Sequence, residues 1–164
     1  MTKEPHDNHA ILERYERLWI YFGLAMVTVF ILGIGYTVLN YGGAIPVSAS
    51  RIDATKVRTE GDFANPRVEQ VGSEFVVYAQ VFAFGYLPAE IKVKKGAKVT
   101  FNITSPDVQH GFMVQGTNIN VQVIPGEVAR VTHTFDRAGE YLLVCNEYCG
   151  LGHANMISKV IVEE

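Results

Sequence analysis

The amino-acid sequence predicts an all-β domain, a Greek-key sandwich or barrel, preceded by one transmembrane helix. The first observation is an uncharged run of twenty-two residues at 18–39. The second is a series of short segments rich in Val, Ile, Tyr and Phe that begins near residue 74 and is separated by Gly, Pro and Ser. The third is that these segments show no helical period. Together these features indicate one anchored β-domain in a chain of 164 residues.

Residues 18–40 are the predicted membrane helix. At about 1.5 Å per residue the uncharged run is ~33 Å long, enough for a hydrocarbon core of ~30 Å. Aromatic residues near its ends, among them Trp19 and Tyr36, suit the headgroup level. A signal peptide is the alternative, but its apolar core is usually only ~7–15 residues after a short basic start. Because a polar lead of mixed charge occupies 1–17, helical from Ala10 onward, we expect an uncleaved single-pass anchor.

Residues 41–72 are expected to form a tether, and residues 73–164 the β-domain. Gly42, Gly43 and Pro46 break the helix, and the polar stretch that follows shows no sustained period. The expected strands of the domain lie at 75–84, 91–94, 98–104, 111–115, 119–123, 128–135, 141–144 and 157–162.

The formal net charge is only −3, with acidic and basic residues interspersed. A nucleic-acid partner would require a strongly basic surface, so none is expected. Basic residues flank the membrane segment on both sides, and they do not decide its orientation.

The chemistry of the chain is concentrated near its C-terminus. Cys145, Cys149, His153 and Met156 lie within twelve residues, and His110 lies thirty-five residues upstream of Cys145. Thiolate, imidazole and thioether together are the ligands that soft copper prefers. Two other interpretations stay open on these residues alone: a structural disulfide between the cysteines and a tetrahedral zinc site of two Cys and two His.

The number of thiols bears on the number of metals. One Cys with two His and a weak Met describes a blue mononuclear copper site. With a second Cys, both thiolates can bridge two copper ions, which leaves one His for each metal. The residues therefore favour a dinuclear centre that shares one electron over two metals.

Two motifs carry a resemblance to a known family. The segments Ser-Pro-Asp-Val-Gln-His-Gly-Phe at 105–112 and Cys-Asn-Glu-Tyr-Cys-Gly-Leu-Gly-His-Ala-Asn-Met at 145–156 resemble subunit II of cytochrome c oxidase, over nearly the whole chain. The single helix, and Val81-Phe-Ala-Phe84-Gly-Tyr86 in place of a tryptophan-rich motif, are similar to the B-type haem-copper oxidases of thermophilic bacteria. The resemblance implies a cupredoxin fold and a dinuclear CuA centre. Its ligands would be His110, Cys145, the Glu147 backbone carbonyl, Cys149, His153 and Met156.

The resemblance also implies a function and partners. A soluble cytochrome c would reduce CuA outside the membrane, and the electron would pass to haem in subunit I, where oxygen is reduced. The domain would lie on the periplasmic or extracytoplasmic side of the cell membrane, in contact with lipid and with a further small single-helix subunit. Electron entry would fall to Phe82, Phe84 or Tyr86, and the Glu147 side chain would offer a magnesium site at subunit I.

A rival interpretation is a membrane-anchored copper chaperone or thiol reductase with Cys-x-x-x-Cys and a distant His. Such proteins need a thioredoxin-like βαβ context, usually with the cysteines before the histidine. Here the order is reversed and the surroundings are predicted to be all-β. Of the remaining polar residues, His133 is expected to be an ordinary strand residue, and Asp107 to orient His110 through a turn hydrogen bond.

Overall fold

The computed structural model describes residues 6–40 and 47–164, which belong to two separate units. The first unit contains one helix, α1 (His6–Asn40), within which His9–Leu39 is long and apolar enough to span a membrane. The hydroxyls of Thr28 and Thr37 donate to the backbone carbonyls of Leu24 and Ile34, both at 2.8 Å, which satisfies them inside an apolar segment. The helix begins earlier than expected, because the polar lead is helical from His6. The predicted break at 42–46 lies outside the described residues.

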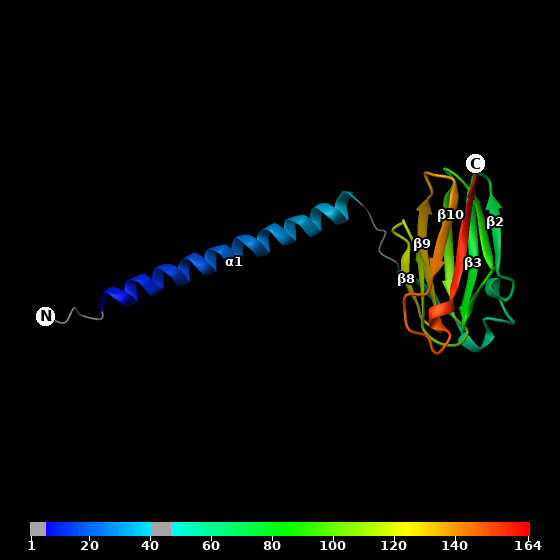
Figure 1. Cartoon of the computed structure of the whole chain (residues 1–164), viewed down its shortest axis with the longest axis horizontal. Coiled ribbons are helices and arrows are strands. Elements are labelled where there is room, and N and C mark those ends of the chain that lie inside the picture. Colours follow the sequence, from blue (N-terminus) through cyan, green and yellow to red (C-terminus); the bar gives the residue numbers. More distant parts are fainter. Residues whose placement is uncertain (1–5, 41–46) are drawn as a thin grey trace. The chain divides into compact units, whose positions relative to one another are not determined.

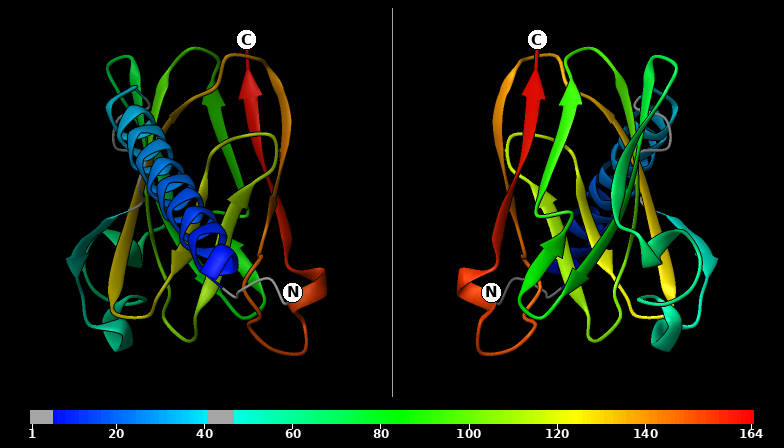
Figure 2. Two further views of the ribbon diagram at one scale, coloured as in Figure 1. Left: turned by 90° about the vertical axis from the view of Figure 1, so that its left-hand side faces the viewer. Right: turned by 90° about the vertical axis from the view of Figure 1, so that its right-hand side faces the viewer.

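The second unit is a sandwich of two β-sheets (Figure 1, Figure 2). One sheet has the order β1-β9-β6-β3-β2, with β4 also paired to β3, and the other has the order β5-β11-β10-β7-β8. The strands are β1 (Val47–Arg51), β2 (Arg67–Val71), β3 (Glu74–Phe82), β4 (Gly85–Leu87), β5 (Glu90–Lys94), β6 (Lys98–Thr104), β7 (His110–Val114), β8 (Asn120–Val123), β9 (Glu127–Thr134), β10 (Gly139–Val144) and β11 (Ile157–Glu163). The predicted all-β class is thereby confirmed.

The core lies between the two sheets and follows from alternation along the strands. In β5, for example, Ile91 and Val93 are buried while their neighbours are exposed, as expected for a strand with one face inward. Phe101 and Phe112 meet across the sandwich with ring centroids 5.8 Å apart. Most pairings are antiparallel, but β3 pairs with β6, and β5 with β11, in parallel, so strands far apart in sequence become neighbours.

The expected tether at 41–72 is wrong in part, because β1 and β2 inside this interval belong to the first sheet. Both strands are only five residues long and lie at sheet edges, which makes them hard to recognise from local sequence. Between them, two short 3₁₀ helices, η1 (Ala54–Lys56) and η2 (Asp62–Ala64), pack beside the sheet. The buried amide of Gln80 fixes this segment by donating to the carbonyls of Val57 at 3.3 Å and Phe63 at 2.5 Å.

One end of the sandwich gathers the motifs found in the sequence. The loops after β6 and β10 meet there, and the segment 145–156, orange in Figures 1 and 2, lies at the end of the domain opposite the C-terminus. Because these loops join strands of a packed sandwich, side chains from distant parts of the chain are held at fixed positions.

Candidate metal centre

Strand ends position the predicted ligands. His110 is the first residue of β7, Cys145 directly follows β10, and Met156 directly precedes β11. The backbone N–H of Cys145 donates to the carbonyl of Met156 at 3.3 Å, which extends the β10–β11 ladder and closes the base of the loop between them. We call residues 145–156 the ligand loop. Inside it, η3 (His153–Asn155) turns the chain back toward β11.

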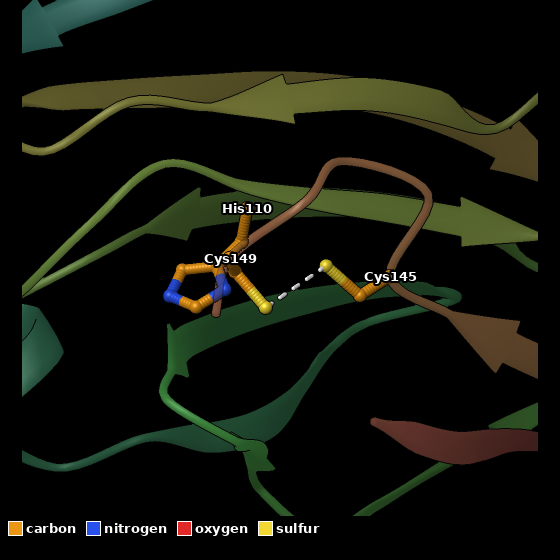
Figure 3. Close-up of side chains that lie close together, drawn as sticks. All are labelled: His110, Cys145 and Cys149. Carbon is orange, nitrogen blue, oxygen red and sulfur yellow. Dashed lines mark hydrogen bonds between the residues drawn. The ribbon is translucent and has the colours of Figure 1, made fainter. Parts of the chain in front are cut away.

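The structure brings all six predicted ligand groups together. His110, Cys145 and Cys149 offer ligand atoms that lie within 4.8 Å of one another (Figure 3). The Cys149 sulfur is 3.6 Å from His153 Nδ1 and 3.6 Å from the Met156 sulfur. The Cys145 sulfur is 3.1 Å from the carbonyl oxygen of Glu147. The six groups form one compact cluster of thiol, thioether, imidazole and carbonyl donors.

The two cysteines are free thiols, and their sulfur atoms lie 3.8 Å apart. A disulfide requires about 2.05 Å, so the structure does not contain the disulfide that the sequence left open. Metal–sulfur bonds of about 2.3 Å let one ion bind two sulfurs separated by up to ~4.6 Å. The spacing therefore suits thiolates that share metal ions.

The environment of His110 provides a second test of metal binding. Its side chain is fully buried, and Nε2 lies 2.9 Å from a carboxylate oxygen of Asp107, which can only accept a hydrogen bond. Nε2 therefore carries a proton, which leaves Nδ1 as the ring nitrogen that can bind a metal. Nδ1 of His110 is buried and has no hydrogen-bond partner. Among the side-chain nitrogen and oxygen atoms of residues 6–40 and 47–164, it alone combines these two properties. A carboxylate on one imidazole nitrogen and a metal on the other is the usual arrangement of a ligating histidine.

Asp107 forms hydrogen bonds with several groups besides His110. Its carboxylate also accepts hydrogen bonds from the backbone N–H groups of Ala83 at 2.8 Å and Val108 at 2.7 Å, and from the Ser105 hydroxyl at 3.1 Å. Partial burial raises the pKa of this carboxyl, but the hydrogen bonds outweigh it and hold the pKa below its usual value. Asp107 is therefore ionised at neutral pH, and its expected hydrogen bond to His110 is present.

The thiol of Cys149 behaves differently. Desolvation, and then the neighbouring thiol of Cys145, raise the pKa of Cys149 to about 11. In the metal-free protein this thiol keeps its proton at neutral pH. Binding of a metal must displace the proton, so affinity should rise with pH.

The three aromatic residues named in the sequence occupy different places. Phe84 is 45% exposed, and its ring lies against the ligand loop so closely that a Cβ on Gly152 would fall 2.5 Å from it. Tyr86 is buried beneath the site, with its hydroxyl 3.5 Å from the carbonyl of Gly111. Phe82 lies further out, under the guanidinium of Arg58 at 5.6 Å. Phe84 and Tyr86 thus belong to the site, whereas Phe82 flanks it.

Other polar residues also take defined places. The Glu147 carboxylate accepts a hydrogen bond from Gln109 at 3.4 Å. His133 lies in β9 and contacts Asn118 at 2.8 Å, which agrees with an ordinary strand residue. The interpretation from sequence missed Ser105, Asn120 and Asn146 around the site. Their hydrogen bonds join residues whose closeness cannot be predicted from a helical or strand pattern in the sequence.

Comparison with known proteins decides the family. Residues 85–164 match the family model described as cytochrome c oxidase subunit II, periplasmic domain. Cytochrome c oxidase subunit 2 from Thermus thermophilus is 50% identical over 98% of this chain and 99% of its own length. The chain belongs to the cytochrome c oxidase subunit II family. The match includes the anchor as well as the β-domain, so the resemblance seen in the sequence is confirmed, and the chain is a membrane subunit of an oxidoreductase complex.

Solved structures agree with this assignment of subunit II. A chain in a haem-copper terminal oxidase dimer determined by cryo-EM has a TM-score of 0.77 and 29% identity, covering 91% of this chain and 99% of that one. The periplasmic domain of subunit II from Bradyrhizobium japonicum has a TM-score of 0.50 at 18% identity, covering 60% of this chain and 88% of that domain, and it shows the shared cupredoxin-like fold. Nitrous-oxide reductase from Pseudomonas fluorescens is 28% identical over 72% of this chain but 18% of its own length. The βαβ context that a thiol reductase would need is not present in residues 47–164.

Proposed function

We propose that this subunit II is the electron-entry subunit of its oxidase. His110, Cys145, Cys149, His153, Met156 and the Glu147 carbonyl would hold a dinuclear copper centre of the CuA type, which supplies a one-electron carrier when bound. The observation that carries the proposal is the convergence of these six groups together with the partnerless, buried Nδ1 of His110. A zinc site of two Cys and two His would leave the placement of Met156 unexplained.

The surroundings of the ligands suit electron transfer. His110, Cys145 and Met156 are buried, so the protein excludes water from most of the site. Asp107 keeps the His110 ring in one orientation and one tautomer. The closed ligand loop and the strands on either side hold the donors in place, which keeps structural rearrangement small when charge changes.

The exposed ring of Phe84 is the proposed point of electron entry. It combines exposure at the surface with direct packing on the ligand loop, whereas Tyr86 is buried and Phe82 is further away. A soluble cytochrome c is the proposed donor. We expect Phe84→Ala to slow reduction of the copper-loaded protein by reduced cytochrome c, and Phe82→Ala to serve as the matched control. Equal rates for the two variants would exclude this route.

The remaining assignments follow from the family and are part of the proposal. The electron would pass to haem in the catalytic subunit I, and a small single-helix subunit would complete the membrane part beside lipid. The domain would lie on the periplasmic or extracytoplasmic side. The Glu147 carboxylate, which accepts only from Gln109 among the hydrogen bonds described, would be available for a magnesium ion at subunit I.

The copper proposal is tested on the full-length chain in detergent, loaded with copper. We expect an electron spin resonance spectrum in which one unpaired electron couples equally to two copper ions. Cys149→Ser should abolish that spectrum, whereas Met156→Leu should preserve it and shift the reduction potential. His133→Ala is the control, because His133 lies outside the cluster. A blue mononuclear spectrum, or an unchanged spectrum in Cys149→Ser, would contradict the proposal.

A further inference from the structure

Asn146 directly follows Cys145, and its side chain reaches a strand that carries none of the six ligand groups. Its Nδ2 donates to Oδ1 of Asn120 at 2.9 Å. Asn120 is the first residue of β8, the edge strand of its sheet, and is in register with Met113 of β7. Both asparagine side chains are exposed. The hydrogen bond therefore connects the first residue of β8 to the ligand loop across β7.

Gly111 of β7 lies directly beneath this connection. A Cβ at Gly111 would collide with the side-chain oxygen of Asn146 and would lie 2.7 Å from its backbone nitrogen and 3.0 Å from that of Glu147. The ligand loop thus packs directly against the backbone of β7 at Gly111. Only glycine, which has no Cβ, permits such a close contact. This closeness lets the Gly111 N–H donate to the Cys145 sulfur at 3.3 Å.

We propose that Asn120 and Asn146 form a clasp that holds the ligand loop on Gly111 and keeps the Gly111 N–H on the Cys145 sulfur. Both are positioning residues. A hydrogen bond to a ligating sulfur draws electron density from it and favours the electron-rich reduced state, so it raises the reduction potential. Without the clasp the loop lifts, the N–H···S bond weakens and the potential falls. The part that concerns bound copper rests on the proposed function.

The experiment uses uncharged variants of the full-length chain in detergent. Asn120→Leu and Asn146→Leu are close to asparagine in size, and each removes one partner of the 2.9 Å hydrogen bond without adding charge. Gln122→Leu is the matched control, because Gln122 is an exposed amide on the same strand, β8. Three quantities are measured: transfer of copper to a chelator, reduction potential, and hydrogen exchange of the Gly111 amide in the metal-free protein.

We expect Asn120→Leu and Asn146→Leu to lose copper about tenfold faster than Gln122→Leu, which is the scale of an outer-shell contact to a metal ligand. Their reduction potentials should be lower and their Gly111 amides should exchange faster. The exposed positions leave thermal unfolding nearly unchanged in all variants. If both asparagine variants agree with Gln122→Leu in all three quantities, the clasp is wrong. If the wild-type chain binds no copper, the proposed function fails, and exchange at Gly111 still decides the clasp.

Discussion

Replacement of Asp107 by alanine tests how much of the site depends on one carboxylate. Three groups donate to it fully: His110 Nε2 and the backbone N–H groups of Ala83 and Val108. The Ser105 hydroxyl lies 3.1 Å away and shares its single proton with the carbonyl of Val108. The N–H groups of Ala83 and Val108 belong to exposed residues and can bond water instead, and Ser105 keeps its 2.6 Å bond to the carbonyl of Val108. The His110 Nε2–H is fully buried and would be left without an acceptor.

The magnitude follows from this inventory. A buried donor that loses its acceptor costs about 1–3 kcal/mol, and the solvated groups add only tenths. We expect Asp107→Ala to lower the free energy of unfolding by about 2 kcal/mol and the Tm of the metal-free protein by about 8 °C. Copper affinity should fall about 10- to 100-fold, because His110 loses the group that fixes its tautomer and orientation.

The assays are thermal unfolding of the metal-free chain and competition for copper with a chelator of known affinity. Asp107→Asn keeps the shape and one acceptor, so about half of the loss in stability is expected. Asp136→Ala removes a carboxylate from the opposite end of the domain and serves as the control. If Asp107→Ala unfolds within ~0.5 kcal/mol of the wild type and binds copper equally well, the carboxylate does not support the site in the way described.

Three further predictions concern the same domain. Gly152→Ala places a Cβ 2.5 Å from the ring of Phe84, so it should cost about 1–3 kcal/mol, and Phe84→Ala in the same chain should restore much of the stability in thermal unfolding. Gln80→Leu removes a buried amide that donates to two carbonyls. We expect the free energy of unfolding to fall by about 1–3 kcal/mol and proteolysis between residues 53 and 65 to become faster. Gln122→Leu is the exposed control. Because the pKa of Asp107 is lower in the folded state, its stabilising effect is present above pH ~4 and is lost as the pH falls through the folded pKa; acid unfolding should therefore differ less between wild type and Asp107→Asn at pH 2 than at pH 6.

The sequence indicates which of the candidate groups can meet, because most of the candidate site is local. Cys145, Cys149, His153 and Met156 lie in a single loop, and their spacing alone indicates that they can meet. His110 is distant in sequence, but a strand that starts with a histidine after a turn can reach the same end of a sandwich. The structure brings these groups together as expected, while their role as copper ligands stays a prediction.

The features that the sequence did not predict depend on contacts between distant segments. β1 and β2 are short edge strands, and their pairing is decided by partners in β9 and β3 that local alternation does not reveal. The Asn120–Asn146 pair spans 26 positions, and asparagine is common in turns for unrelated reasons. The packing of the Phe84 ring against Gly152 was likewise not predicted. It depends on the β3–β4 turn and the ligand loop lying side by side in the folded domain.

The position of β11 has a consequence for biosynthesis. This last strand lies inside its sheet, between β5 and β10, and β5 forms its ladder with β11 alone among the described strands. The second sheet therefore stays incomplete until residues 157–163 have been synthesised. His153 and Met156 are made directly before that strand, so the candidate ligand cluster is completed together with the sheet and not before it.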